Sequence, residues 1–295
     1  MTLGVYAAPL TPFTPSGGLA LEAVPRYLGF LLDHGISGLL ALGTNGEFAS
    51  LTVGEREAVL QAFIDGSAGR VPVVANVGAT AVPDVLALAR HARRAGADAV
   101  ALLPPYYYPL SDPGFEALVD TVADAFGAPV YLYNIPRYTG YAIPPTVVAA
   151  GVERGVVRGL KDSSQDTAYL ATVRALAPSA ELFVGSDTTL VEGLAAGADG
   201  VVSGMANTYP DLIVAVYRAF HRRSPDLPAL RERLLKVRRL FARYPYLAAT
   251  REALRLRGLD LGPPRAPLTP IAAGDRAGLA EALSDIHGRT EEVSG

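Results

Sequence analysis

The segment VVRGLKDSS, residues 156–164, closes an apolar run with a lysine, a residue type that the rest of the chain almost avoids. Only two of the 26 basic residues are lysines, Lys161 and Lys236. Burial disfavours the charged form of an amine, and enzymes use buried lysines as nucleophiles that condense with a ketone to form a Schiff base. Lys161 is therefore our candidate nucleophile. The structural alternative is an ion pair between Lys161 and Asp162 or another carboxylate at the end of the run.

Two further segments end apolar runs with groups that could assist this chemistry. Tyr133 closes the run in YLYN, and a phenol there can move protons to and from a bound carbonyl or hydroxyl. A core tyrosine with a satisfied hydroxyl is the alternative. In GTNGEF, residues 43–48, the backbone amides and the Thr44 hydroxyl could bind a carboxylate, although the same glycines also suit an ordinary turn.

Other classes of catalytic site lack the residues they need. The chain has no cysteine, which removes thiolate catalysis, thiolate metal ligands and disulfides. All four histidines fall in or at the ends of expected outer helices: His34, His91, His221 and His287. A metal-dependent aldolase or hydrolase is therefore poorly supported, and a Ser-His-Asp triad has no candidate base. We expect covalent chemistry that uses no metal and no bound cofactor.

The candidate residues stand at the ends of short buried runs, with helical patterns between these runs. We predict eight β-strands, at 4–9, 37–42, 71–76, 98–103, 129–134, 156–161, 181–185 and 199–204. Because the runs are apolar throughout, they indicate a parallel sheet covered by helices, and we predict a closed (β/α)8 TIM barrel. Active sites of such barrels lie at the carboxyl ends of the strands. The main alternative is a doubly wound open sheet, but a proline-rich segment stands where its glycine-rich fingerprint would follow the first strand.

Repeated segments support the alternation of helices and strands. AGADAVALL at 95–103 and AGADGVVSG at 196–204 both end a helix at a glycine and start a strand. After residue 210 the pattern is helical, with proline-containing interruptions that mark helix boundaries. We predict one domain over residues 1–295, in which a barrel at 1–223 carries a C-terminal helical extension at 224–295.

Charge and hydropathy limit the class of partner. The formal net charge is −3, half of the residues are hydrophobic, and basic and acidic residues are mixed throughout. This pattern is not that of a nucleic-acid binder or of a protein that docks on a membrane surface, so we expect a small-molecule partner. The first residues lack a secretion-signal pattern and nowhere do 18 apolar residues run together, so we expect a cytoplasmic protein.

Five motifs resemble those of one superfamily. They are GTNGE at 43–47, PPYY at 104–107, YNIPRYTG at 133–140, GLKDSS at 159–164 and GVVSGMAN at 200–207. In this order and spacing, over nearly the whole chain, they resemble the dihydrodipicolinate synthase and N-acetylneuraminate lyase superfamily. The resemblance implies a class I aldolase-like barrel in which Lys161 forms a Schiff base with pyruvate or with the pyruvate end of a 2-oxo acid.

The same resemblance implies roles for other residues. Tyr133 matches the tyrosine that shuttles the proton. Thr44 matches the hydroxyl residue of the relay and of the carboxylate pocket, with Asn45 beside it. Val202 matches the residue whose backbone carbonyl lines the pyruvate site. We also expect Gly185, at the end of the strand 181–185, to contact the substrate.

The tyrosine run between the prolines could form a rigid aromatic contact surface, because interfaces favour tyrosine. Within it, Tyr107 matches a tyrosine that reaches into the neighbouring subunit's site in dihydrodipicolinate synthases, where it takes part in catalysis. The resemblance therefore implies a homotetramer built as a dimer of dimers.

Two departures bear on the substrate. Dihydrodipicolinate synthases usually read GTTGE and carry an arginine directly before the TG of the strand-five loop. This chain has Asn45 and Tyr138 at these places, with Arg137 one residue earlier, where it is a candidate substrate-binding residue. GTNGEF followed by LT and ER looks more like the 4-hydroxy-2-oxoglutarate aldolase and 2-keto-3-deoxy sugar acid aldolase branches.

We therefore predict a Schiff-base lyase that cleaves or forms a 4-hydroxy-2-oxo acid or a 2-keto-3-deoxy sugar acid, with pyruvate and an aldehyde as the smaller partners. The first alternative is 4-hydroxy-tetrahydrodipicolinate synthase, which condenses pyruvate with aspartate semialdehyde. A second, from a different class, is a catalytically silent barrel that binds a 2-oxo acid and acts as a regulator.

Overall fold

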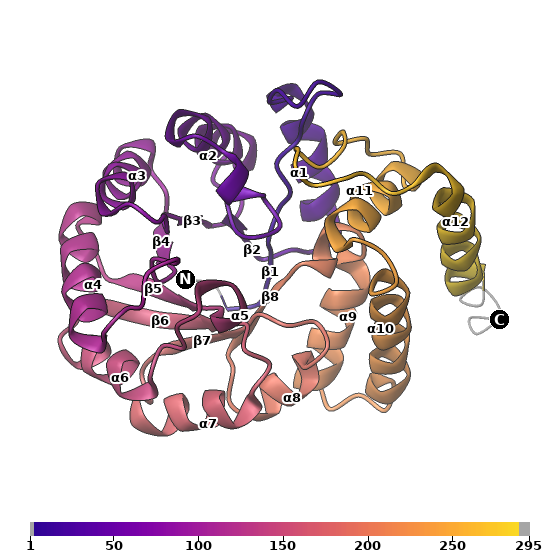
Figure 1. The fold of residues 1–295 in the computed structure, drawn as a ribbon. Coiled ribbons are helices and arrows are strands. Elements are labelled where there is room, and N and C mark those ends of the chain that lie inside the picture. Colours follow the sequence, from indigo (N-terminus) through magenta and orange to yellow (C-terminus); the bar gives the residue numbers. More distant parts are fainter. Residues whose placement is uncertain (1–2, 289–295) are drawn as a thin grey trace.

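A closed barrel of eight parallel strands forms the centre of the molecule in a computed structural model that describes residues 3–288, and their side chains as far as residue 284 (Figure 1). The strands are β1 Val5–Ala7, β2 Gly38–Ala41, β3 Val73–Asn76, β4 Ala99–Leu102, β5 Val130–Asn134, β6 Val157–Asp162, β7 Glu181–Val184 and β8 Gly200–Ser203. Each strand pairs with the next, and β8 closes the ring on β1. The predicted barrel and its eight strands are confirmed, and the open sheet is wrong.

Helices surround the barrel and follow the strands in alternation (Figure 1). They are α1 Val24–Asp33, α2 Val53–Ser67, α3 Val82–Ala95, α4 Asp112–Phe126, α6 Pro145–Glu153, α7 Thr167–Leu176, α8 Leu190–Ala195 and α9 Pro210–His221. The loop after β5 contains the short helix α5 Pro136–Thr139. Three 3-10 turns complete the connections: η1 Leu21–Ala23, η2 Phe48–Ser50 and η3 Met205–Asn207.

Local sequence signals set the ends of these helices. Thr52 and Glu55 form a reciprocal capping box at the start of α2. Gly96 ends α3 with φ +85°, and Gly197 follows α8 with φ +103°, a region of φ that favours glycine. Both glycines belong to the repeated segments in the sequence, so the predicted helix stops are confirmed.

The core has two layers. Inside the barrel, Tyr6, Tyr131 and Phe183 pack edge to face, with ring centroids 5.2 Å apart for Tyr6 and Phe183 and 5.9 Å apart for Tyr131 and Phe183. A larger set of aliphatic side chains packs between the strands and the outer helices. The strands are therefore buried on both faces, as their uniformly apolar runs predicted.

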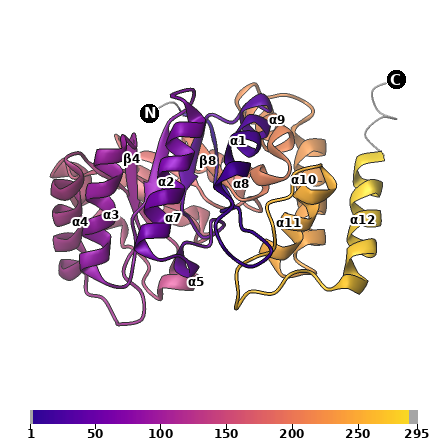
Figure 2. The ribbon, with the colours of Figure 1, turned by 90° about the horizontal axis from the view of Figure 1, so that it is seen from above.

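Three C-terminal helices extend one flank of the barrel (Figures 1 and 2). They are α10 Leu227–Phe241, α11 Tyr246–Leu256 and α12 Ala273–Gly288, and α10 packs against both α9 and α12. The predicted helical extension is thus present as far as residue 288, while residues 1–2 and 289–295 lie outside the described part. The predicted division at 223/224 falls between α9 and α10, and the assignment of one domain stays a prediction.

Across the described residues, no helix is long and apolar enough to cross a membrane.

Candidate active site

Lys161 and Tyr133 lie side by side at the carboxyl ends of two neighbouring strands. They are register partners on β6 and β5, and the Lys161 Nζ lies 3.8 Å from the centroid of the Tyr133 ring. The two residues are 5% and 2% exposed. The face of an aromatic ring attracts a cation but does not neutralise it as a carboxylate would. The amine is therefore held close to the phenol in an environment from which water is largely excluded.

The alternative role for Lys161, an ion pair, is absent from the described part of the chain. The neighbouring Asp162 accepts hydrogen bonds from Asn134 Nδ2, at 2.7 Å, and from the Ser164 hydroxyl, at 2.8 Å. Burial raises the pKa of the Asp162 carboxyl. These bonds hold the ends of β5 and β6 together, and Asp162 makes no ion pair with the lysine amine. The Asp187 carboxylate interacts with that amine only through its charge.

Thr44 joins the pair from the end of β2. Its Oγ1 lies 3.2 Å from the Tyr133 hydroxyl, close enough for a hydrogen bond in either direction. Tyr133 is buried, as a purely structural core tyrosine would be. Its hydroxyl, however, lies against the candidate residue Thr44 and not against a partner in the core. The phenol and the Thr44 hydroxyl form a hydrogen-bonded pair that could pass a proton, and the amine lies beside this pair, over the face of the ring.

Gly185 after β7, Val202 on β8 and Asn45 beside Thr44 lie near this group. A Cβ on Gly185 would lie only 2.9 Å from the Lys161 Cε, so glycine leaves the room that the lysine stem occupies. Val202 lies with Lys161 at a small cavity on the barrel axis. Asn45 approaches β8, because a Cβ on Gly204 would lie 2.7 Å from its Nδ2. The structure therefore brings six of the predicted site residues to one end of the barrel.

Tyr107 and Arg137 lie apart from the group. Tyr107 is 86% exposed and adopts φ +102°, and its ring packs against that of Tyr108. Arg137 is exposed, with its Cζ 5.6 Å from the centroid of the Tyr138 ring. Within one chain neither side chain reaches the lysine.

Asp187, one of the loop side chains expected from the sequence to set the substrate beyond its pyruvate carbons, is buried at the site. Its carboxylate accepts hydrogen bonds from the Ser203 hydroxyl and from the Met205 backbone amide, the latter at 3.1 Å. Burial raises the pKa of the Asp187 carboxyl. The residue ties the end of β7 to the end of β8, and the sequence indicates it by its place in the loop that follows β7.

A buried ion pair anchors the loop that carries Thr44. Glu47 has a left-handed φ of +54° and a fully buried side chain. Its carboxylate binds Arg251 of α11 at 2.6 Å and accepts a hydrogen bond from the Arg265 backbone amide at 2.8 Å. The C-terminal segment therefore holds the loop that carries Thr44 in place. Sequence reasoning missed this, because the partners are separated by about 200 residues.

Arg265 makes a second link between the C-terminal segment and the same loop. Its guanidinium binds both oxygens of Glu55, at 2.9 and 2.7 Å, and donates to the Ser50 carbonyl. The hydrogen bond from Arg265 lowers the pKa of Glu55 to about 2. Glu55, a member of the capping box of α2, thus also binds the C-terminal segment through Arg265.

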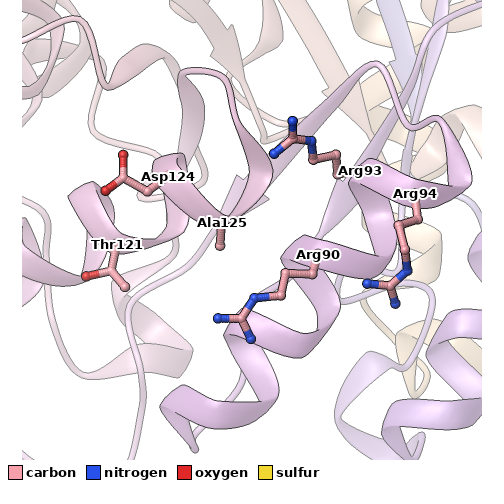
Figure 3. A pocket seen from close by; sticks show the side chains of 6 residues that line it. All are labelled: Arg90, Arg93, Arg94, Thr121, Asp124 and Ala125. Atoms are coloured by element: carbon pink, nitrogen blue, oxygen red, sulfur yellow. The ribbon is translucent and has the colours of Figure 1, made fainter.

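A separate hollow of about 540 Å³ lies on the outer surface between α3 and α4 (Figure 3). It is lined by Arg90, Arg93, Arg94, Thr121, Asp124 and Ala125. The three arginines are exposed, and the hollow contains none of the predicted site residues. The predicted site residues at the mouth of the barrel are thus separate from this hollow.

Comparison with known families decides the identity of this barrel. The model of the dihydrodipicolinate synthetase family matches residues 1–286. The chain belongs to the dihydrodipicolinate synthetase family. The superfamily predicted from the five motifs is therefore confirmed.

Several members of the family are similar over almost their whole length. An uncharacterized DapA-like lyase of Halobacterium salinarum is 37% identical over 284 residues, which cover 96% of this chain and 93% of the relative. A 4-hydroxy-tetrahydrodipicolinate synthase of Acidothermus cellulolyticus is 36% identical, with 99% and 94% covered. A probable 2-dehydro-3-deoxy-D-pentonate aldolase of Escherichia coli is 30% identical, with 88% of each chain covered.

A solved structure from the dihydrodipicolinate synthetase family has the same fold. It is a prophage protein of Escherichia coli K12 in complex with pyruvate, with a TM-score of 0.92 and 27% identity over 97% of this chain and 99% of that one. Family membership makes the chain an enzyme of the lyase class, as predicted, and the silent regulatory barrel is not supported. The names of the relatives differ in substrate, so membership alone leaves the substrate open.

The Arg265–Glu55 link predicts a pH dependence of stability. Because the folded-state pKa of Glu55 is lowered, the link stabilises the fold above the ordinary glutamate pKa of 4.5 and is lost as pH falls towards about 2. We expect Glu55→Gln, which keeps a capping side chain, to remove about 1 kcal/mol of stability at pH 7, with the partial exposure of the pair taken into account. Urea unfolding at pH 7 and pH 3 measures this difference.

Glu232→Gln is the matched control, because Glu232 forms an exposed pair with Lys236. We expect it to leave unfolding at both pH values nearly unchanged. Equal losses in the two variants at pH 7, or a Glu55→Gln deficit that persists undiminished at pH 3, would contradict the role of the Arg265 link.

Proposed function

We propose that this enzyme is a class I lyase that cleaves a 4-hydroxy-2-oxo acid into pyruvate and an aldehyde, or forms the acid from them. The observation that carries the proposal is the buried amine of Lys161, which has no ion pair within the described chain and lies 3.8 Å from the Tyr133 ring. A buried lysine that forms no ion pair is a candidate nucleophile for a carbonyl carbon. The pyruvate bound in a solved relative supports the same assignment.

The reaction follows from the chemistry of the amine. The Lys161 Nζ adds to the C2 carbonyl of the 2-oxo acid and water leaves, which gives a protonated Schiff base. Removal of the proton from the C4 hydroxyl breaks the C3–C4 bond, the electron pair moves towards the Schiff-base nitrogen, and an aldehyde departs. Protonation of the resulting enamine at C3 and addition of water release pyruvate and restore the amine. The Schiff base is the electron sink, so we propose that no metal or other cofactor takes part.

Tyr133 and Thr44 would carry the protons. The phenol lies against the amine and within 3.2 Å of the Thr44 hydroxyl, so a proton can pass between the substrate and the loop. We assign the substrate carboxylate to Thr44 and to the backbone amides around Asn45, with Gly185 and Val202 next to the pyruvate carbons. In a close variant the Schiff base loses a C3 proton and the C4 hydroxyl leaves as water, which would make the enzyme a dehydratase.

The second candidate is 4-hydroxy-tetrahydrodipicolinate synthase. The relative of that name from Acidothermus cellulolyticus is 36% identical and covers 99% of this chain, which favours this alternative. It needs a cation for the carboxylate of aspartate semialdehyde. Dihydrodipicolinate synthases usually carry an arginine directly before the TG of the strand-five loop. Here Tyr138 occupies that place and Arg137 lies exposed, so we place this candidate second.

The cytoplasmic location expected from the sequence stays a prediction.

Pyruvate release from 4-hydroxy-2-oxopentanoate tests the reaction. We expect the enzyme to release pyruvate and acetaldehyde, measured by a coupled lactate dehydrogenase assay. Tyr133→Phe should lower kcat by about 10²- to 10⁴-fold, because it removes the group that moves the proton. Condensation of pyruvate with aspartate semialdehyde, in the absence of any cleavage, would overturn the proposal in favour of the second candidate.

We further propose that the enzyme is a homotetramer, a dimer of dimers, in which Tyr107 completes the proton path of a neighbouring subunit. Two observations support this assembly. Tyr107 and Tyr108 expose 86% and 80% of their surface in the single chain. The positive φ of Tyr107 is a costly conformation for a non-glycine residue, and such conformations cluster at functional sites.

Mixing two inactive variants tests this arrangement. Tyr107→Phe keeps the aromatic ring, and Lys161→Ala keeps Tyr107, so we expect a refolded mixture to regain part of the activity that each variant lacks alone. Sedimentation velocity should give four times the chain mass of 30.9 kDa. A monomeric protein, or a mixture with no recovery, would show that Tyr107 does not act across an interface.

A further inference from the structure

A cavity of about 350 Å³ leads outward from Thr44 at the mouth of the barrel. Cavities of about 300 to 1,000 Å³ are typical of small-molecule sites. Most of its lining is aromatic or aliphatic: Phe48, Leu103, Tyr106, Ile135, Tyr138 and Leu247. On the function proposed above, the part of the substrate beyond the pyruvate carbons would extend into this space.

The cavity lining carries no free charge. Glu47 is the one charged residue in the lining, and both of its carboxylate oxygens are occupied. Oε1 binds Arg251, and Oε2 accepts the Arg265 backbone amide. Glu47 therefore acts as a structural anchor. Its carboxylate oxygens are engaged within the protein, and the charge of Arg251 balances its own.

The nearby cations are directed elsewhere. Arg56 lies over the Phe48 ring at 5.2 Å, but its guanidinium donates to the carbonyls of Asn76 and Gly78. Arg137 stacks on the outer tyrosine, Tyr138, and is not part of the cavity lining. A carboxylate at the far end of a ligand would lose water and meet no cation among the described residues that line the cavity, which is costly.

The lining also offers few hydrogen bonds to a polyhydroxylated chain. Thr139 is buried and donates its hydroxyl to backbone carbonyls of its own turn, those of Ile135 at 3.2 Å and Tyr141 at 3.0 Å. Thr44 is already engaged with Tyr133. A site selects a sugar chain by pairing its hydroxyls. In the described lining only the hydroxyls of Ser50, Tyr106 and Tyr138 are left for such pairing, fewer than a polyhydroxylated chain needs.

We propose that the natural aldehyde partner carries an uncharged, apolar tail, aromatic or branched aliphatic, that fills this cavity. The inference rests on the function proposed above and names its substrate class. It disfavours the sugar acids and the dicarboxylic 4-hydroxy-2-oxo acids among the substrates that the sequence suggested. Tyr138, at the rim of the cavity, is the residue that determines this preference.

A matched pair of aldehydes tests the preference. 4-Methylbenzaldehyde and 4-carboxybenzaldehyde have nearly the same shape and differ in charge. With pyruvate as the second reactant, we expect kcat/KM to be about 100-fold higher for the methyl compound. D-glyceraldehyde should be a poor acceptor. Equal or better use of the carboxylated aldehyde or of glyceraldehyde would overturn the inference.

An added cation at the rim should change the preference. Tyr138 is 60% exposed, so Tyr138→Arg is expected to fold, and its guanidinium can pair with a carboxylate in the cavity. We expect the ratio of the two aldehydes to move about tenfold towards the carboxylated one. Leu176→Arg adds the same charge at the end of α7, on the outer layer, and should leave the ratio unchanged. An equal shift in both variants would contradict a role for Tyr138.

Two measurements separate a failure of this inference from a failure of the proposed function. Exchange of the C3 protons of pyruvate in D₂O, followed by NMR, reports enamine formation without any aldehyde. If the pyruvate protons exchange and the enzyme also turns over the carboxylated aldehyde as well as the methyl compound, the proposed function stands and the inference about the apolar tail is overturned. If exchange is absent, saturation-transfer NMR with 4-methylbenzyl alcohol and 4-carboxybenzyl alcohol decides, because stronger binding of the methyl compound supports the apolar site and the reverse overturns it.

Discussion

The burial of Lys161 beside Tyr133, without an ion pair among the described residues, is the constraint on which the rest of the site depends. A polar group stays buried only if the surrounding structure holds it in place. The barrel does so with its aromatic interior and with the register of β5 and β6, which sets Tyr133 opposite Lys161. Asn134 and Ser164 hold Asp162 away from the amine. The reactive group is therefore a product of the whole barrel.

The C-terminal helices share in this arrangement. Through Arg251 and the backbone of Arg265 they hold Glu47, and Glu47 belongs to the same loop as Thr44. A buried ion pair of this kind adds little net stability, but loss of one partner is strongly destabilising, so it fixes the loop in one conformation. The extension thus has a part in positioning the proton path and is more than an appendage to the barrel.

Much of this could be predicted from the sequence, because strand ends in a parallel barrel converge at one face. The apolar runs identified all eight strands, and Lys161, Tyr133 and Thr44 followed as the polar residues that end them. Arg251 and Arg265 could not be predicted in the same way. Their partners are distant in sequence, and neither an arginine in an amphipathic helix such as Arg251 nor one in a connecting segment such as Arg265 can be told from a solvated residue by its sequence. The direction of Arg137 was likewise open, since a loop side chain follows backbone angles that the sequence does not reveal.

The central claim is that Lys161 itself becomes covalently bound to pyruvate, and one measurement tests it directly. The enzyme is incubated with pyruvate and sodium borohydride, digested, and examined by mass spectrometry, with Lys161→Ala as the control. The account predicts a reduced pyruvate adduct on the peptide that contains Lys161 and none on the control protein. An adduct on Lys236 alone, or no adduct at all, would contradict it.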